Sequence, residues 1–354
     1  MIIEFVYGER QQFRYRHQDI NIIGRLHAAA MPVRRATYRL NDSAPVAFYV
    51  EHVPDLSLRA GANGGWYATP IDWRIAYKDS RAGLRLKRLG DFNIEIPIDS
   101  PELVTGQNRV RVEIEDHGKI VDRAAVEFSW DPTPVPLPLD LSDLSGYRDV
   151  QELAQVADGL FAIDPARNVI HAETPADPDS LLLLGSPHAS QEATYQIVFH
   201  QPNKAKYLGL SDYFVRHEAE DPPIGIKPGY STAGLATVKF DGEARAWISF
   251  GDNAHRAEGW VKFTEPPSIF HAQDSVPYRV RHQVIFEQGH NRARFRIWLA
   301  GEPEPETWLC DEDDSGIVPS LPRFTQATFG LFQHTGVGSE WSDIRVTALE
   351  HAGG

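Results

Sequence analysis

The stretch GLFQHTGVGSEWSDIRVTAL, which runs from Gly330 to Leu349, decides the fold of this chain. Apolar residues alternate with polar or small ones on both sides of the glycines Gly336 and Gly338. Alternation with period two predicts β-strands, and closely spaced glycines predict a turn. The chain therefore nearly finishes on a two-stranded hairpin, which we expect to close a β-sandwich.

The composition of the 354 residues supports the same all-β class. The sequence contains 27 Gly and 25 Pro but only 2 Met, which favours many turns and short strands over long helices. Apolar residues make up 42% of the chain, and this is ample for a buried core. No alternation of strands and helices is present, so a doubly wound parallel sheet is not expected.

The charge balance limits the partners and the setting. The chain has 35 basic and 49 acidic residues, a net charge of −14. Binding to phosphates or anionic lipids needs a positive field, so the sequence predicts no nucleic-acid and no membrane partner. The opening residues MIIEFVYGER carry Glu4 and Glu9 where a signal peptide would have its apolar core. We therefore expect a cytoplasmic protein, unless the numbering begins after a removed signal.

A proline-rich segment divides the chain. Residues 131–146 read DPTPVPLPLDLSDLSG, with prolines at alternate positions that neither a helix interior nor a central strand accepts. Such a segment favours an extended, stiff connector. We expect a first domain over 1–130, a linker over 131–146 and a second domain over 147–354.

The first domain resembles bacterial immunoglobulin-like β-sandwiches. The resemblance rests on a spaced pattern near the end of the domain: Leu103, Gly106, Asn108, Val110, Val112, Ile114, Asp116 and Gly118. It implies an immunoglobulin-like sandwich that is able to contact a protein partner. Residues 51–83 break the strand rhythm and predict a long insertion, in which Trp66, Tyr67 and Trp73 are more typical of local packing than of ligand contact.

The second domain resembles concanavalin A-like (laminin G-like) jelly-roll sandwiches. Eight or more alternating segments follow residue 180, and two long stretches, 278–308 and 329–346, carry the likeness. The last stretch is similar to the closing strands of the 3-keto-disaccharide hydrolase group. Its matching positions are Gly330, Leu331, Gly336, Asp343, Ile344 and Val346. The resemblance implies a fold over about Asp158 to Leu349, but it brings no catalytic motif with it.

Side-chain alternation places a set of polar and aromatic residues on the outer side of the strands in the second domain. Planar Arg and Gln groups and aromatic faces suit the hydroxyls, carboxylates and C–H patches of sugars. The candidate ligand-binding residues are Gln196, Arg245, Trp247, Arg279, Arg281, Gln283, Arg294, Arg296 and Gln333. We expect Gln196, Trp247, Arg281 and Arg296 to converge on one hollow. An ordinary solvated face of an antiparallel sheet, with cross-strand charge pairs, is the alternative.

Other chemistry has weaker sequence support. The acids near Glu218 precede two prolines, Ser231 lacks a nucleophile-elbow pattern, and the histidines lack zinc spacing. The acidic run from Asp311 to Asp314 is compatible with a structural calcium ion, although an exposed acidic turn explains it as well. We expect no other cofactor and no zinc.

Three functions remain open from the sequence. The first is a carbohydrate-recognition protein that binds a neutral or anionic poly- or oligosaccharide. The second is a glycan-cleaving enzyme, either a hydrolase or a lyase. A lyase would use Arg281 to neutralise a uronate carboxylate, and His200 or Tyr213 to take and return a proton. The third is a non-catalytic structural or assembly module.

Overall fold

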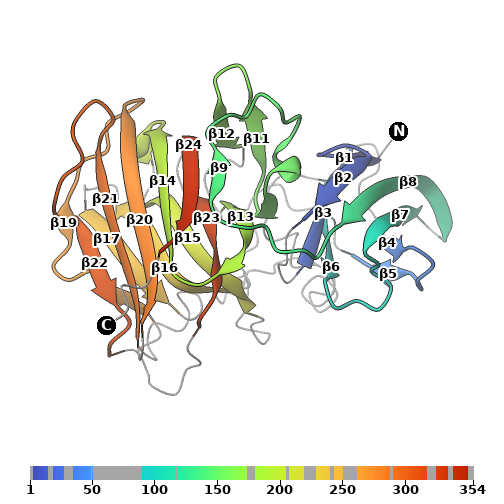
Figure 1. Ribbon diagram of the computed structural model, residues 1–354. Helices are drawn as coiled ribbons and strands as arrows, with labels where there is room; N and C mark the ends of the chain where they lie inside the picture. Colours follow the sequence, from blue (N-terminus) through green and yellow to red (C-terminus); the bar gives the residue numbers. More distant parts are fainter. Residues whose placement is uncertain are drawn as a thin grey trace, which may run out of the picture. The chain divides into compact units, whose positions relative to one another are not determined.

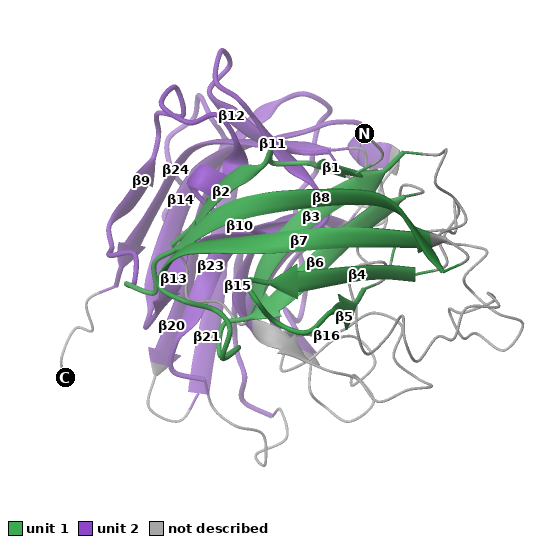
Figure 2. Cartoon of the chain, turned by 90° about the vertical axis from the view of Figure 1, so that its right-hand side faces the viewer, with its two compact units in different colours: residues 1–133, 219–228 green, residues 134–218, 229–354 purple. Residues whose placement is uncertain are grey.

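The computed structural model describes fourteen parts of the chain. These are residues 3–14, 19–27, 35–48, 50, 90–116, 118–173, 180–204, 207–218, 229–239, 243–249, 261–287, 290–316, 324–333 and 338–349. Most of them lie in β-strands, which confirms the all-β class (Figure 1). The chain splits into unit 1, Met1–Thr133 with Ala219–Pro228, and unit 2, Pro134–Glu218 with Gly229–Gly354 (Figure 2). None of the described helices is long and apolar enough to cross a bilayer.

Unit 1 is a sandwich of a three-stranded and a five-stranded sheet. The first sheet has the order β1 (Ile3–Phe5), β3 (Asp19–Leu26), β6 (Asp91–Pro97). The second has the order β2 (Arg10–Phe13), β8 (Lys119–Trp130), β7 (Gly106–Asp116), β4 (Arg35–Leu40), β5 (Val46–Ala47). One apolar core joins the two sheets. The ring centre of Phe48, which directly follows β5 of the second sheet, lies 5.1 Å from the ring centre of Phe92 in β6 of the first sheet. The immunoglobulin-like assignment of this unit stays a prediction, and the residues 51–83 lie outside the described parts.

Unit 2 is a sandwich of two larger antiparallel sheets, as a jelly roll requires (Figure 1). We name each sheet after its central strand. The β15 sheet has the order β10 (Gln155–Asp158), β13 (Ser180–His188), β23 (Ala327–Gln333), β15 (Tyr207–Glu218), β16 (Gly229–Lys239), β17 (Glu243–Ser249), β18 (Val261–Phe263), with β19 (Ser268–Ile269) beside β17. The β14 sheet has the order β11 (Phe161–Asp164), β12 (Val169–Ala172), β24 (Ser339–Ala348), β14 (Gln191–Phe199), β20 (Pro277–Glu287), β21 (His290–Leu299), β22 (Cys310–Asp313), with β9 (Leu139–Leu141) beside β24.

The expected terminal hairpin is two strands that belong to different sheets. β23 lies in the β15 sheet and β24 lies in the β14 sheet, so the two strands do not pair with each other. The indole Nε1 of Trp341 in β24 donates to the carbonyl oxygen of Leu210 in β15, at 3.1 Å. The stretch therefore does close the sandwich, but it joins the layers instead of extending one of them.

Part of the expected linker belongs to unit 2. β9 pairs with β24 through Leu141 and Ile344, and the Nε2 of His188 lies 2.7 Å from the carbonyl oxygen of Val135. The chain from Pro134 onward is therefore held against unit 2. The segment after residue 147 contains a single 3-10 turn, Val150–Glu152, capped by the side chain of Asp149.

Candidate functional site

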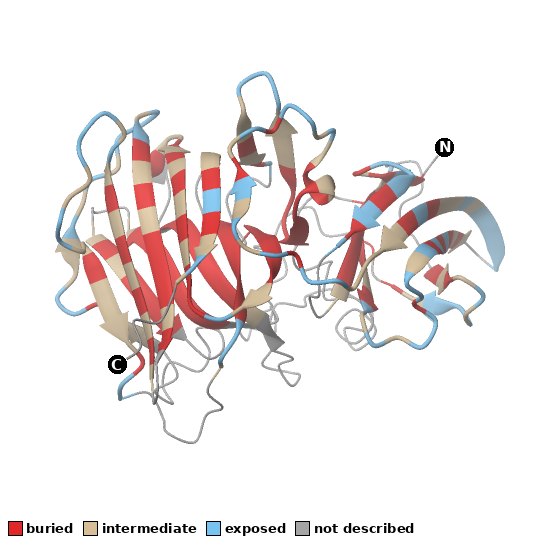
Figure 3. Cartoon of the chain, viewed as in Figure 1, coloured by how far each residue is buried: buried red, intermediate tan, exposed pale blue. Residues whose placement is uncertain are grey.

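Three neighbouring strands of the β14 sheet present a regular grid of side chains on its outer side. Along β14 and β21, buried and half-buried residues alternate strictly (Figure 3). The register aligns the outward residues in three rows across β14, β20 and β21. The rows are Gln196, Arg279, Trp298; Thr194, Arg281, Arg296; and Glu192, Gln283, Arg294. We call these nine residues the polar face.

Arg281 is the centre of the polar face. One of its terminal nitrogens binds the carboxylate of Glu192, which also accepts a hydrogen bond from the Gln283 amide. Its Nε and Nη2 bind the two carboxylate oxygens of Glu304, at 2.7 and 3.0 Å. Glu304 lies in the loop that follows β21, so this loop is tied to the face by a bidentate ion pair.

Trp308, at the end of the same loop, lies over the face. The guanidinium carbons of Arg294 and Arg296 are 4.4 and 4.0 Å from the centre of its ring. The Nη1 of Arg296 also donates to Glu304 and to the carbonyl oxygen of Pro305, at 2.9 and 2.7 Å. Cation–π contacts and hydrogen bonds therefore hold two of the arginines in fixed orientations.

Contacts on the polar face shift the pKa values of Arg281, Glu304 and Arg294. The hydrogen bond to Glu304 raises the pKa of Arg281, and that same bond lowers the pKa of Glu304. Burial and the neighbouring Arg292 lower the pKa of Arg294, which binds the side-chain oxygen of Gln283 at 2.7 Å. Among the described residues no carboxylate forms an ion pair with Arg294. The face therefore presents fixed cations and a fixed carboxylate instead of a group prepared to exchange protons.

Three of the nine predicted ligand-binding residues lie elsewhere. Trp247 and Arg245 belong to β17 of the other sheet, and the four side chains expected in one hollow are therefore spread over two sheets. Trp247 is 8% exposed and packs with Phe214 and Phe332 on the outer side of the β15 sheet. Alternation gave the correct side for Trp247 and Arg245, but it contains no information on which sheet the strand joins. For Gln333 the predicted outer side was wrong.

Gln333 and Arg245 also lie away from the polar face. Gln333 is buried, on the same side of β23 as Phe329 and Leu331, and it pairs with Ser180 of β13. Arg245 binds Glu243 at 2.7 Å and lies over the ring of Phe263. Alternation predicts that the next residue, His334, lies on the opposite side from Gln333, but it falls outside the described parts.

The three catalytic candidates do not form one site. Tyr213 is fully buried between the sheets, where its hydroxyl accepts from the Gln191 amide at 2.7 Å and burial raises its pKa far above the ordinary value. His200 follows β14, with Nε2 3.2 Å from a carboxylate oxygen of Glu340. Arg281 lies outward at the middle of the polar face. Because Tyr213 faces the interior, it cannot exchange protons with a ligand on that face.

Sequence reasoning missed Glu192, Glu304 and Trp308. Glu192 follows the same alternation as Gln196 and could have been found by extending that pattern down the strand. Glu304 and Trp308 lie in a loop, where no periodicity indicates the direction of a side chain. Only the fold of the loop brings them over the arginines.

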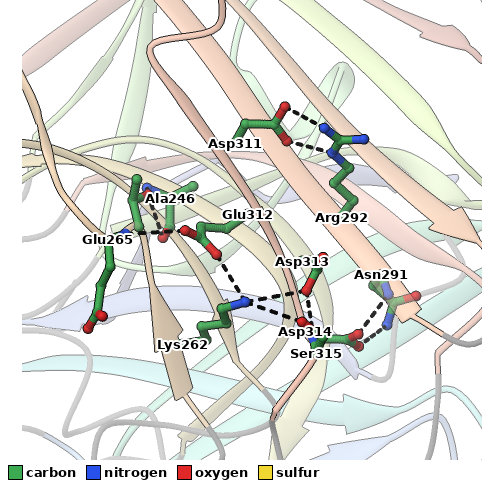
Figure 4. A network of polar contacts seen from close by, with 11 residues as sticks. Ala246, Lys262, Glu265, Asn291, Arg292, Asp311, Glu312, Asp313, Asp314 and Ser315 are labelled. Carbon is green, nitrogen blue, oxygen red and sulfur yellow. Dashed lines mark hydrogen bonds and ion pairs between the residues drawn. The ribbon is translucent and has the colours of Figure 1, made fainter.

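The acidic run Asp311–Asp314 is engaged in protein contacts (Figure 4). Asp311 binds Arg292 with both oxygens, at 2.5 and 2.6 Å, and Asp314 accepts from the backbone and side chain of Asn291. Lys262 of β18 binds Glu312 and Asp313 at 3.1 and 3.3 Å. Within the described ranges no group of three or more His, Cys, Asp or Glu side chains is arranged to hold a metal ion. We therefore propose no calcium site here.

Several sequence candidates fall on residues that are not described. They include Trp66, Tyr67 and Trp73 of the predicted insertion, and the side chains of Glu218, Glu220, Asp221 and Ser231.

Comparison with known proteins gives structural neighbours only. No family model and no curated protein matches the chain. A carbohydrate-binding module, CBM66 from Bacillus subtilis, is 13% identical, with a TM-score of 0.35 over 55% of this chain and 95% of that one. A legume lectin-like domain from Entamoeba histolytica is 8% identical, with a TM-score of 0.36 over 57% and 92%. A bifunctional GH43-CE protein from Bacteroides eggerthii is 12% identical, with a TM-score of 0.40 over 74% and 31%. Because these TM-scores are below 0.5, we base the fold on strand order and packing alone.

Proposed function

We propose that unit 2 is a carbohydrate-recognition module that binds a polysaccharide or oligosaccharide on the polar face. The observation that carries the proposal is the row Gln196, Arg279, Trp298, which is continuous with the held arginines of the next two rows. Trp298 is half-buried, so part of this residue stays accessible on the face. Aromatic faces suit the C–H patches of sugar rings, and amide and guanidinium groups suit their hydroxyls.

The rigidity of the face supports binding. The hydrogen bonds that join Glu192 to Arg281 and Gln283, and Gln283 to Arg294, fix side chains that would otherwise lose rotamer freedom on contact with a ligand. Prior ordering of this kind lowers the entropic cost of association. The remaining exposure of the polar groups leaves donors and acceptors for hydroxyls.

Binding without cleavage fits the face better than hydrolysis or elimination. A glycoside hydrolase needs a general acid with a raised pKa. The contact with Arg281 lowers the pKa of Glu304 instead. A lyase needs a proton-transfer group at the sugar. Tyr213 is enclosed between the two sheets, and His200 lies beyond the end of β14, where it contacts Glu340.

A panel of neutral and uronic-acid polysaccharides tests the proposal. We expect the protein to be retarded in gels that contain the recognised polymer, with no new reducing ends and no absorbance from unsaturated products. Reducing ends would indicate a hydrolase, and new absorbance would indicate a lyase. Migration unchanged by every polymer would favour a structural or assembly module and would contradict the proposal.

Two neighbouring substitutions locate the site. Trp298→Ala should weaken retardation at least about tenfold, because a central aromatic contact is lost. Leu299→Ala is the control, since Leu299 is 42% exposed and follows Trp298 directly in the chain. Equal effects of the two substitutions would remove the polar face as the binding surface.

A further inference from the structure

The carboxylate of Glu304 occupies the position that an acidic ligand group would take on the polar face. It binds the Nε and Nη2 edge of Arg281 with both oxygens and binds Nη1 of Arg296 with one of them, at 2.9 Å. Paired contacts from arginine to a carboxylate are the arrangement by which proteins recognise acidic ligands. Here the carboxylate comes from the chain itself.

The loop that carries Glu304 is held to the face through few groups. Between Gly301 and Thr307 the described side chains are exposed, except for Glu304 and Pro305, which are half-buried. Backbone hydrogen bonds from Ala300 to Pro277 and from Leu309 to Phe295, at 3.0 and 3.1 Å, hold the two ends of the loop to β20 and β21. Between these ends, the loop binds the described residues of the polar face through the Glu304 carboxylate, the Pro305 carbonyl oxygen and the Trp308 ring. A loop attached in this way can leave the face without breaking the strands beneath it.

Arg296 is incompletely paired while the loop is in place. Its Nη1 serves two acceptors, but its Nε is buried and has no hydrogen-bond partner among the described residues. A buried donor without an acceptor is costly. A ligand carboxylate that approached Arg296 along its Nε edge would supply that acceptor.

The charge of the face also favours an anion. Arg279 is paired with Asp343, and Arg281, Arg294 and Arg296 face Glu192 and Glu304. Four positive and three negative charges therefore leave an excess of one positive charge. Displacement of Glu304 raises the excess to two. An acidic sugar that replaced Glu304 would restore the balance, whereas a neutral sugar would leave the arginines unpaired.

We propose that the ligand of the polar face is an acidic saccharide, and that Glu304 is an internal competitor which the sugar carboxylate displaces. This inference rests on the proposed carbohydrate-binding function. It assigns the 300–309 loop a regulatory part, because the loop covers the arginines until a carboxylated sugar arrives. The acidic group then binds between Arg281 and Arg296.

Matched ligands and matched variants test this inference. The probes are short oligosaccharides of galacturonate, mannuronate and glucuronate, each with its methyl ester, which keeps the sugar chain and removes the charge. The variants are Glu304→Gln and Glu304→Ala. The control is Glu306→Gln, an exposed glutamate of the same loop for which no ion pair is found in the described part of the chain. Affinities are measured by calorimetric titration, with thermal unfolding as a check of folding.

We expect the affinity for one of the acidic oligosaccharides to rise about tenfold in both Glu304 variants and to stay unchanged in Glu306→Gln. Binding of that acid to the unaltered protein should also speed backbone amide exchange in residues 300–309, because the loop leaves the face. An unchanged or lower affinity in the Glu304 variants, or slower exchange in the loop, would overturn the inference.

The experiment separates failure of the inference from failure of the proposed function. If the acids and their methyl esters bind equally and the Glu304 variants match the unaltered protein, the internal competitor is refuted while carbohydrate binding stands. If none of these acids or esters binds to any of the four proteins while a polysaccharide of the panel still retards the unaltered protein, only the inference falls. If the panel is silent as well, both proposals fall.

Discussion

At the scale of single residues, His282 links the stability of unit 2 to pH. Its ring is fully buried between the sheets, where the hydroxyl of Tyr195 donates to Ser211 and the Ser211 hydroxyl is hydrogen-bonded to Nδ1 of His282 at 2.5 Å. The Nε2 atom has no hydrogen-bond partner within the described residues. Burial therefore favours the neutral ring and lowers the pKa of His282 from 6.5 to about 3.

The sign of the effect follows from proton linkage. Between pH 6.5 and about 3 the unfolded chain binds a proton that folded His282 does not, so the free energy of unfolding falls as the pH falls. The expected slope from this residue is about 1.4 kcal/mol per pH unit. His282→Asn retains an acceptor near the position of Nδ1 and does not titrate. Urea unfolding at pH 7.5, 6 and 5 should show that acidification lowers the free energy of unfolding less in this variant than in the unaltered protein. An identical dependence on pH in the two proteins would refute the assignment.

His171 supplies an internal comparison of opposite sign. A hydrogen bond with Glu173 raises its pKa, so its contribution is present below pH 6.5 and is lost as the pH rises through the raised value. His171→Asn should therefore steepen the loss of stability on acidification in the same urea series. A shallower loss would contradict this contact.

At the residue scale, the sequence predicts which side chains of a single strand point outward, because this depends only on alternation within that strand. The outward set Gln196, Arg281 and Arg296 follows from the alternation of each strand, and the structure places them together. Trp247 obeyed the same alternation, yet β17 belongs to the other sheet. Sheet membership depends on pairing between distant segments, which local periodicity does not contain. Whether the outward set binds a ligand stays a prediction.

At the scale of elements, the close approach of β15 and β23 requires glycine. A Cβ added at Gly209 would lie 2.4 Å from the backbone oxygen of Phe332, and a paired backbone cannot move away. We expect Gly209→Ala to lower the free energy of unfolding by about 2 kcal/mol or more. Gly301→Ala is the control, since nothing lies within 4 Å of a Cβ there. Equal urea midpoints for the two variants would contradict this packing.

A second element-scale feature is the edge where β18 of one sheet meets β22 of the other (Figure 4). Lys262 of β18 binds Glu312 and Asp313 of β22. Burial alone would raise the pKa of Asp313, but hydrogen bonds from Ser315 and Lys262 outweigh it and lower the pKa to about 2. Ion pairs thus connect two edge strands that belong to different sheets.

We expect Lys262→Met to reduce the free energy of unfolding by about 1 kcal/mol, because partly exposed ion pairs contribute little each. The contribution of Asp313 to the free energy of unfolding is present above pH 3.8 and is lost as the pH falls through about 2. Arg345→Gln, which breaks a pair with Asp140 between two exposed groups, should change less in the same urea titration. A larger loss for Arg345→Gln would remove the special role of this edge.

At the scale of the whole molecule, composition and turn signals predict the all-β class because they are sums over the chain. The proline-rich segment marked a region near the boundary between the units, but β9 and Val135 are held to unit 2 by partners far along the sequence. The positions of loop residues likewise depend on partners far along the sequence. Glu304 and Trp308 complete the polar face through tertiary contacts, and a net charge of −14 gives no sign of a local excess of arginine.

The central claim is that a saccharide binds on the polar face, and hydroxyl-radical footprinting tests it most directly. The reaction oxidises accessible tryptophan rings, and Trp298 of the polar face and Trp130 of unit 1 are both half-buried. With a saturating saccharide from the polysaccharide panel, we expect oxidation of Trp298 to fall several-fold while that of Trp130 stays the same. Protection of Trp130 with no change at Trp298 would contradict the account.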